Sequence, residues 1–156
     1  MKVKVKVPAT SANLGPGFDV AGLALTLYNT FTFELADQGL NITGCPEQFC
    51  NEENMTYQAF KQAAEICGLE YQGVNIECSG DVPYTRGLGS SSTCIVAGIV
   101  GAFAFKDKVE DRQEILELAT AIEGHPDNVA PAIFGGLTVS VMEEDNVLTS
   151  VSYTHL

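Results

Sequence analysis

The sequence predicts an α+β fold, in which a mixed and mostly antiparallel sheet has helices packed on it. Lys and Val alternate strictly from Lys2 to Val7, which indicates a strand with one apolar face. Strand-forming Thr, Tyr and Phe recur from Leu23 to Leu35. Apolar residues at helical spacing run from Glu53 to Cys67 and from Glu110 to Glu123. With 156 residues, 46% of them apolar, the chain is long enough for one domain with its own core.

The elements follow from local patterns along the chain. Pro8 is expected to end the first strand, and the small and turn-forming residues of 9–19 predict an irregular loop. The helix at 53–67 is expected to bury Met55, Ala59, Ala63, Ile66 and Cys67 and to stop at Gly68. The other expected elements are strands at 40–43 and 74–78, a buried helix over 95–105, a helix at 110–123, and two strands at 137–142 and 147–151 around a turn at 144–146.

Charge and cysteine usage exclude several classes of function. The net charge is −12, from 20 acidic and 8 basic residues, which argues against a nucleic-acid or anionic-membrane surface. The five cysteines include no Cys-x-x-Cys pair, which fits a reducing compartment. The longest apolar run, Cys94 to Phe105, is shorter than the roughly 18 residues of a membrane span, and no export signal is recognised. We therefore expect a cytoplasmic protein. In such an acidic chain, an anionic ligand would be held by local features such as backbone N–H groups, a helix N-terminus and a divalent cation.

One glycine-serine stretch predicts such a feature. Gly87-Leu88-Gly89 is followed by four hydroxyl residues and then by the apolar run. The N-terminus of a helix attracts anions, because its first N–H groups lack internal partners and its dipole is positive there. The stretch is neither a Walker loop, which needs a lysine, nor a dinucleotide fingerprint, which needs a third glycine. A serine-rich cap on a core helix is the structural alternative.

The stretch Pro83-x-x-x-Gly87-Leu88-Gly89-Ser90-Ser91-Ser92 resembles the ATP-binding signature of the GHMP kinases. The resemblance implies the N-terminal domain of that family, with a fold like ribosomal protein S5 domain 2, over residues 1–156. It also implies ATP as cosubstrate. The ATP-binding residues would be Pro83, Tyr84, Thr85, Arg86, Gly87, Leu88, Gly89, Ser90, Ser91, Ser92, Thr93 and Asn54. Residue type alone predicts that Asn54 caps the helix that follows it.

Two further stretches, residues 10–19 and 123–136, resemble the homoserine-kinase branch in particular. The resemblance implies that Asn13, Asp19, His125 and Asn128 contact the substrate L-homoserine, and that Glu123 and Ser91 hold Mg²⁺. Asp19 can pair with an ammonium group, and Asn13 can donate and accept hydrogen bonds. The structural alternatives are a mere connector at 9–19, a surface role for His125, and a capped short helix after residues 127 and 128.

The resemblance also suggests a mechanism. Glu123 and Asn128 would be the catalytic residues, with Asn128 orienting the acceptor hydroxyl, since an amide cannot remove a proton. Asp127 is a second candidate for the base. A family member has a C-terminal domain that this chain lacks, so we expect a truncated product. Exposed apolar surface would then favour self-association, for example as a homodimer. The alternatives are a mevalonate-type or shikimate-type kinase of the family and a non-catalytic nucleotide-binding fragment.

Overall fold

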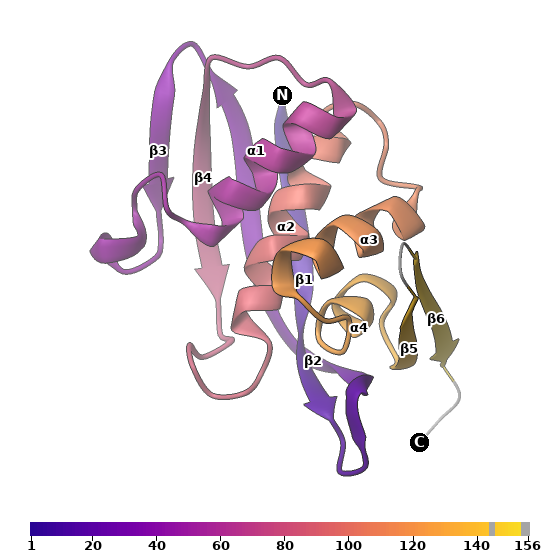
Figure 1. Cartoon of the computed structure of the whole chain (residues 1–156). Helices are drawn as coiled ribbons and strands as arrows, with labels where there is room; N and C mark the ends of the chain where they lie inside the picture. Colours follow the sequence, from indigo (N-terminus) through magenta and orange to yellow (C-terminus); the bar gives the residue numbers. More distant parts are fainter. Residues whose placement is uncertain (144–145, 154–156) are drawn as a thin grey trace.

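The computed structural model describes residues 1–143 and 146–153, and its strands within these ranges form one six-stranded sheet (Figure 1). The order is β3-β4-β2-β5-β6, and β1 also pairs with β2. Only β3 and β4 are parallel among the described pairs. The strands are β1 (Lys2–Asn13), β2 (Gly17–Ala36), β3 (Gly39–Thr43), β4 (Gly73–Gly80), β5 (Leu137–Glu143) and β6 (Asn146–Ser152). The predicted mixed, mostly antiparallel sheet is confirmed.

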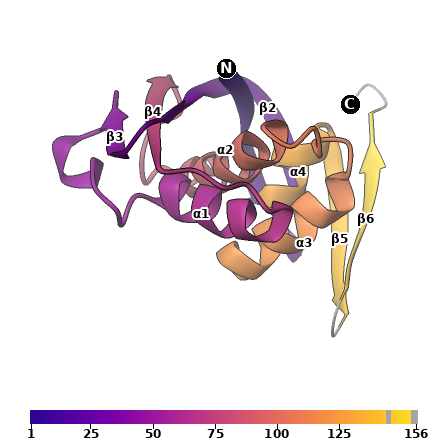
Figure 2. The same cartoon turned by 90° about the horizontal axis from the view of Figure 1, so that it is seen from above.

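The helices lie together on one face of the sheet, as the view from above shows (Figure 2). They are α1 (Met55–Cys67), α2 (Ser90–Ala104), α3 (Arg112–Glu123) and α4 (Val129–Phe134), with a 3-10 turn η1 (Glu47–Phe49) before α1. The alternation in β1 behaves as predicted, because Val3, Val5 and Val7 are buried while the lysines between them are exposed. The part of the predicted turn at residues 144–145 lies outside the described residues.

The prediction of an irregular loop over residues 9–19 is wrong. Strand β1 continues through Pro8 to Asn13, and β2 already begins at Gly17, so most of this stretch is a β-hairpin. Pro8 is tolerated because β1 pairs with β2 alone in the described sheet, and an edge strand needs no donor on its free side. The register of the β1–β2 pair shifts between Pro8 and Thr10, which indicates a β-bulge there.

The core forms between the sheet and α1 and α2. Phe33 of β2 stacks on Phe60 of α1, with ring centroids 5.5 Å apart. Two glycines of α2 allow close packing, since a Cβ on Gly98 would overlap the Thr56 carbonyl and one on Gly101 would press on the Phe33 ring. The helix predicted from residue 53 begins at Met55 and ends at a left-handed Gly68, as expected.

Its buried face differs from the prediction. Met55 and Ile66 are about half exposed, at 53% and 50% of their surface, whereas Phe60 and Ala64 are buried. Ala59, Ala63 and Cys67 are buried as predicted, so the prediction is wrong only at Met55 and Ile66. None of the helices within 1–143 and 146–153 combines the length and hydropathy that a membrane crossing requires.

Candidate active site

The N-terminus of α2 is left open by its own sequence. Gly89 occupies the N-cap position with φ 64°, a left-handed conformation that favours glycine, and no side chain caps the helix there. A Cβ on Gly89 would overlap Thr10 Oγ1, so glycine is also required by the neighbouring strand. The serines that follow do not cap the helix, which counts against the structural alternative. The first backbone N–H groups of α2 are therefore available to an anion.

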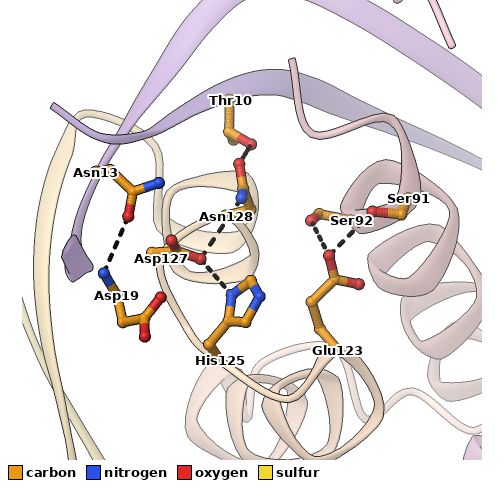
Figure 3. Close-up of polar contacts among 9 residues, drawn as sticks. All are labelled: Thr10, Asn13, Asp19, Ser91, Ser92, Glu123, His125, Asp127 and Asn128. Atoms are coloured by element: carbon orange, nitrogen blue, oxygen red, sulfur yellow. Dashed lines mark hydrogen bonds and ion pairs between the residues drawn. The ribbon is translucent and has the colours of Figure 1, made fainter. Parts of the chain in front are cut away.

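The serine hydroxyls instead face the C-terminal end of α3. Ser91 Oγ donates to Glu123 Oε1 at 2.9 Å, and Ser92 Oγ donates to the same oxygen at 3.2 Å. Glu123 is the last residue of α3, and Gly124 in a left-handed conformation turns the chain away after it. The predicted pair Ser91 and Glu123 is thus brought together from two helices, as Figure 3 shows. Hydroxyl and carboxylate oxygens are donors of the kind that a hard divalent cation prefers.

A cavity of about 900 Å³ opens beside this helix end. Of the predicted ATP-binding residues, those that line it are Asn54, Tyr84, Thr85, Arg86, Gly87, Gly89, Ser90 and Ser91. Pro83, Leu88, Ser92 and Thr93 do not line it. Ser92 and Thr93 are fully buried, and Thr93 Oγ1 accepts a hydrogen bond from Asn29 Nδ2. These two residues support the loop from behind, which corrects the idea that the whole stretch faces a ligand.

Asn54 caps α1, as residue type predicts, and it also lies at the cavity. Its Oδ1 accepts from the backbone N–H groups of Thr56 and Tyr57, so it caps α1, and its Nδ2 donates to the Phe49 carbonyl at 2.8 Å. The residue also lines the cavity. The Asn54 amide therefore joins the N-terminus of α1 to the loop that precedes it.

Sequence reasoning missed the opposite wall of the cavity. That wall comes from the loop after β3 and from β4, and it includes Cys45, Phe49 and Cys78. The Phe49 ring lies 6.4 Å from the Tyr84 ring, which gives the cavity an aromatic border. Burial raises the pKa of Tyr84 and keeps its phenol neutral. The one feature of the sequence that could have indicated this wall is Phe49, an aromatic residue in a loop that carries no motif.

A second polar cluster surrounds Asn128, just before α4. Thr10 Oγ1 donates to Asn128 Oδ1 at 2.8 Å, and Asn128 Nδ2 lies 3.5 Å from Asp127 Oδ1. The Asp127 carboxylate is 2% exposed and is 2.5 Å from His125 Nδ1. Although Asn128 holds the N-cap position of α4, its side chain makes no capping bond, so it is free for this network. Thr10 is fully buried, and its N–H also donates to the Leu88 carbonyl, so it links the two clusters.

The tip of the β1–β2 hairpin completes this cluster. Asp19, with φ 56°, donates its backbone N–H to Asn13 Oδ1 at 3.0 Å. One ligand atom from each of Asp19, His125 and Asp127 lies within 4.8 Å of the others. In the view of Figure 3, Asp127 and Asn128 lie between the Asn13–Asp19 pair and the Ser91–Glu123 contact. All four predicted substrate residues are therefore near one another, and a cationic group would fit between the two carboxylates.

Asn128 connects the cavity with the second polar cluster, because it lines the cavity and also contacts Asp127. Asn13, Asp19, Glu123 and His125 do not line the cavity. Arg86 is the one cationic side chain among its described lining residues, in a chain of net charge −12. A polyanion in this cavity would depend on backbone N–H groups, the α2 dipole and Arg86.

Comparison with known proteins gives consistent results. The family profile described as the GHMP kinases N terminal domain matches residues 54–136. A homoserine kinase of Clostridium beijerinckii is 53% identical over 144 residues, which cover 92% of this chain and 48% of the relative. A homoserine kinase of Clostridium botulinum is 50% identical over 147 residues, with 94% and 49% covered. This chain thus spans about half the length of the curated relatives it matches.

Solved structures share the fold. The homoserine kinase from Cytophaga hutchinsonii superimposes with a TM-score of 0.80 at 30% identity, over 96% of this chain and 51% of that one. The mevalonate kinase of Methanococcus jannaschii gives a TM-score of 0.73 at 16% identity, over 95% and 55%. The second likeness concerns the fold alone.

Proposed function

Because the chain belongs to the GHMP kinase family, we propose that it binds ATP at the open end of α2 and takes part in phosphoryl transfer to the hydroxyl of L-homoserine. The observation that carries this proposal is the position of Asn128. Its amide lines the cavity and also contacts Asp127, whose carboxylate meets His125. An acceptor hydroxyl held at Asn128 would therefore face a phosphate in the cavity, the relation that in-line transfer requires.

The nucleotide side of the proposal rests on four features. The cavity volume of about 900 Å³ lies within the range of small-molecule sites. Its phosphate end would be the uncapped first turn of α2 together with Gly89. Phe49 and Tyr84 would flank the base at the other end. Arg86 would supply local positive charge in an acidic chain.

The donor set at the helix junction fits Mg²⁺. Ser91 Oγ and Ser92 Oγ both lie within hydrogen-bonding distance of Glu123 Oε1, so two hydroxyls and one carboxylate converge without nitrogen or sulfur. We assign the metal to Ser91 and Glu123. When bound, Mg²⁺ would neutralise part of the phosphate charge that builds up during transfer. The Glu123 carboxylate accepts hydrogen bonds from both serine hydroxyls and so holds them in place.

The acceptor side would bind an amino alcohol. The carboxylates of Asp19 and Asp127 lie near each other, so an α-ammonium group between them would gain two charge-assisted hydrogen bonds. Asn13 would hold the hairpin tip in place through the Asp19 N–H. The 53% identity to a homoserine kinase favours homoserine among amino alcohols, over a mevalonate-type or shikimate-type acceptor.

Asn128 would act by orientation. Its Oδ1 accepts from Thr10 and its Nδ2 points to Asp127, so the amide is held in one rotamer. The acceptor oxygen would form its bond to the γ-phosphorus while the bond to the β–γ bridging oxygen breaks. The proton of the hydroxyl would pass to a phosphate oxygen or to solvent, because an amide cannot accept it. Asp127 remains the second candidate for the base, although His125 already engages its carboxylate.

The test has two stages. Calorimetry with ATP, with and without Mg²⁺, should give saturable binding that Ser91→Ala and Glu123→Gln weaken when Mg²⁺ is present. Incubation with γ-labelled ATP and a panel of L-homoserine, mevalonate and shikimate should then label homoserine. Absence of ATP binding would refute the whole proposal, and label on another acceptor would refute the substrate.

Binding without transfer to any acceptor would support a second function, a nucleotide-binding unit. The observation that favours this alternative is the cavity of about 900 Å³ beside the uncapped first turn of α2.

A further inference from the structure

Two cysteines of the loop after β3 are in contact, and one of them lines the cavity. Cys45 Sγ and Cys50 Sγ are 3.3 Å apart. The turn between them is tight, since the Phe49 N–H donates to the Pro46 carbonyl at 2.8 Å and the Cys50 N–H donates to the Glu47 carbonyl at 3.0 Å. Cys45 lines the cavity, and neither cysteine is buried. The local backbone therefore holds two thiols together, one of them at the cavity and the other just outside it.

We propose that Cys45 and Cys50 are an oxidation site that forms a disulfide beside this cavity. A disulfide has a sulfur–sulfur distance of about 2.05 Å, so the two atoms need to approach by only a little over 1 Å. The segment between them is an exposed loop rather than a regular strand or α-helix, which can absorb a shift of this size.

The chemistry balances with a low-molecular-weight disulfide as oxidant. The Cys50 thiolate attacks one sulfur of the oxidant, and the first small thiolate leaves. Cys45 Sγ then attacks Cys50 Sγ, and the second small thiolate leaves. The oxidant gains two electrons and takes the two protons of the cysteines, while the protein gains one sulfur–sulfur bond.

The roles of the two cysteines differ for a physical reason. Burial, with the neighbouring Cys50, raises the pKa of Cys45 to about 11. Because the thiolate is the attacking form, Cys45 is the poorer first nucleophile. Its part is the second step, in which it loses its proton as it attacks Cys50 Sγ, 3.3 Å away. The other thiols are less suited, since burial raises the pKa of Cys78 to about 12 and Cys67 is only 6% exposed.

The disulfide would alter the cavity through Phe49. This residue precedes Cys50, its ring faces Tyr84, and its carbonyl accepts from Asn54, which caps α1. Phe49 is 44% exposed, so a shift of about 1 Å would weaken the few contacts that it makes with Tyr84 and Asn54. On the proposed function, the oxidised chain should therefore bind nucleotide more weakly than the reduced chain.

The crosslink can be mapped without reference to any activity. Trypsin cuts after Lys6, Lys61, Arg86 and Lys106, so Cys45 and Cys50 fall in one peptide, Cys67 and Cys78 in the next, and Cys94 in a third. After treatment of the folded chain with oxidised glutathione, we expect loss of two of the five thiols and of two hydrogens from the peptide 7–61. Peptides joined to one another, or glutathione retained on Cys50, would overturn the proposal.

Matched variants make the assignment specific. Cys50→Ser should retain its other four thiols and form no internal bond, whereas Cys67→Ala should still lose two thiols. Oxidation in urea, where the turn is lost, should be slower and should give mixed pairings. Equal rates in the folded and unfolded chains would show that the fold does not promote the bond, and would refute the inference.

A fluorescent ATP analogue tests the consequence for binding. The affinity should fall at least about threefold on oxidation and recover with a reductant, and Cys50→Ser should be insensitive. Equal affinity of the two forms would refute the effect on the cavity. Failure of the reduced chain to bind the analogue would count against the proposed function, while the peptide map would still decide whether the disulfide forms.

Discussion

Replacement of Thr10 by Val tests whether this buried hydroxyl holds the Asn128 amide. Val keeps the shape of Thr but removes the donor that lies 2.8 Å from Asn128 Oδ1. Thr10 is fully buried and Asn128 is half-buried, so water can replace only part of the lost bond. The expected cost is about 1–2 kcal/mol of folding free energy. For a chain of this length, each kcal/mol corresponds to about 2–4 °C in melting temperature.

Equilibrium urea unfolding measures this cost. Thr10→Ser retains the hydroxyl and serves as the matched control. Because it keeps the hydrogen bond, it should lose less folding free energy than Thr10→Val. A double-mutant cycle with Asn128→Ala isolates the pair, and the coupling energy should be about 1 kcal/mol. If Thr10→Val costs the same whether or not Asn128 is present, the hydroxyl does not hold the amide, and the network described here is wrong.

Three further predictions follow from the same geometry. Glu123→Gln should raise the Mg²⁺ concentration needed for nucleotide binding and depress any turnover strongly, and a magnesium titration that matches the parent would remove Glu123 from the metal site. Gly89→Ala should destabilise the fold by about 1–3 kcal/mol through overlap and backbone strain, whereas Gly87→Ala, with φ 69° and open space around it, should cost less in the same unfolding assay. The raised pKa values of Cys45 (about 11) and Cys78 (about 12) mean that their contribution to stability is complete below the ordinary value of 9.0 and is lost as pH rises toward 11–12. The free energy of unfolding should fall less between pH 9 and 12 in Cys45→Ser and Cys78→Ser than in the parent chain. The same fall in a variant and in the parent would contradict the raised pKa of that cysteine.

Local patterns predicted the elements better than their boundaries. The alternation in β1 and the glycine stop after α1 depend on neighbours in sequence, and both are present. The stretch at 9–19 was misjudged because its small residues suit both a loop and a bulged hairpin. Pairing with β2, the next strand of the hairpin, decided the outcome, because Thr10 to Asn13 pair with residues between Gly17 and Ala24.

The site was predictable where a motif carried it. Ser91 and Glu123 are 32 residues apart and meet as the resemblance implied, but the roles of Ser92 and Thr93 behind the loop were not visible. Burial depends on the packing of α2, which a motif does not encode. The part played by Thr10 was missed for the same reason, since its bond to Asn128 spans 118 positions of the chain.

The glycines of α2 have a kinetic consequence. Gly98 and Gly101 let α2 pack so closely on the Thr56 carbonyl and the Phe33 ring that a Cβ at either position would overlap them. The first turn of α2 is therefore preset before a ligand arrives, and adjustment falls to the exposed stretch 83–87 upstream. In a stopped-flow experiment, binding of a fluorescent ATP analogue at this turn should give a single phase whose rate depends on concentration. Any slower phase should disappear when substitutions restrict the backbone of residues 83–87.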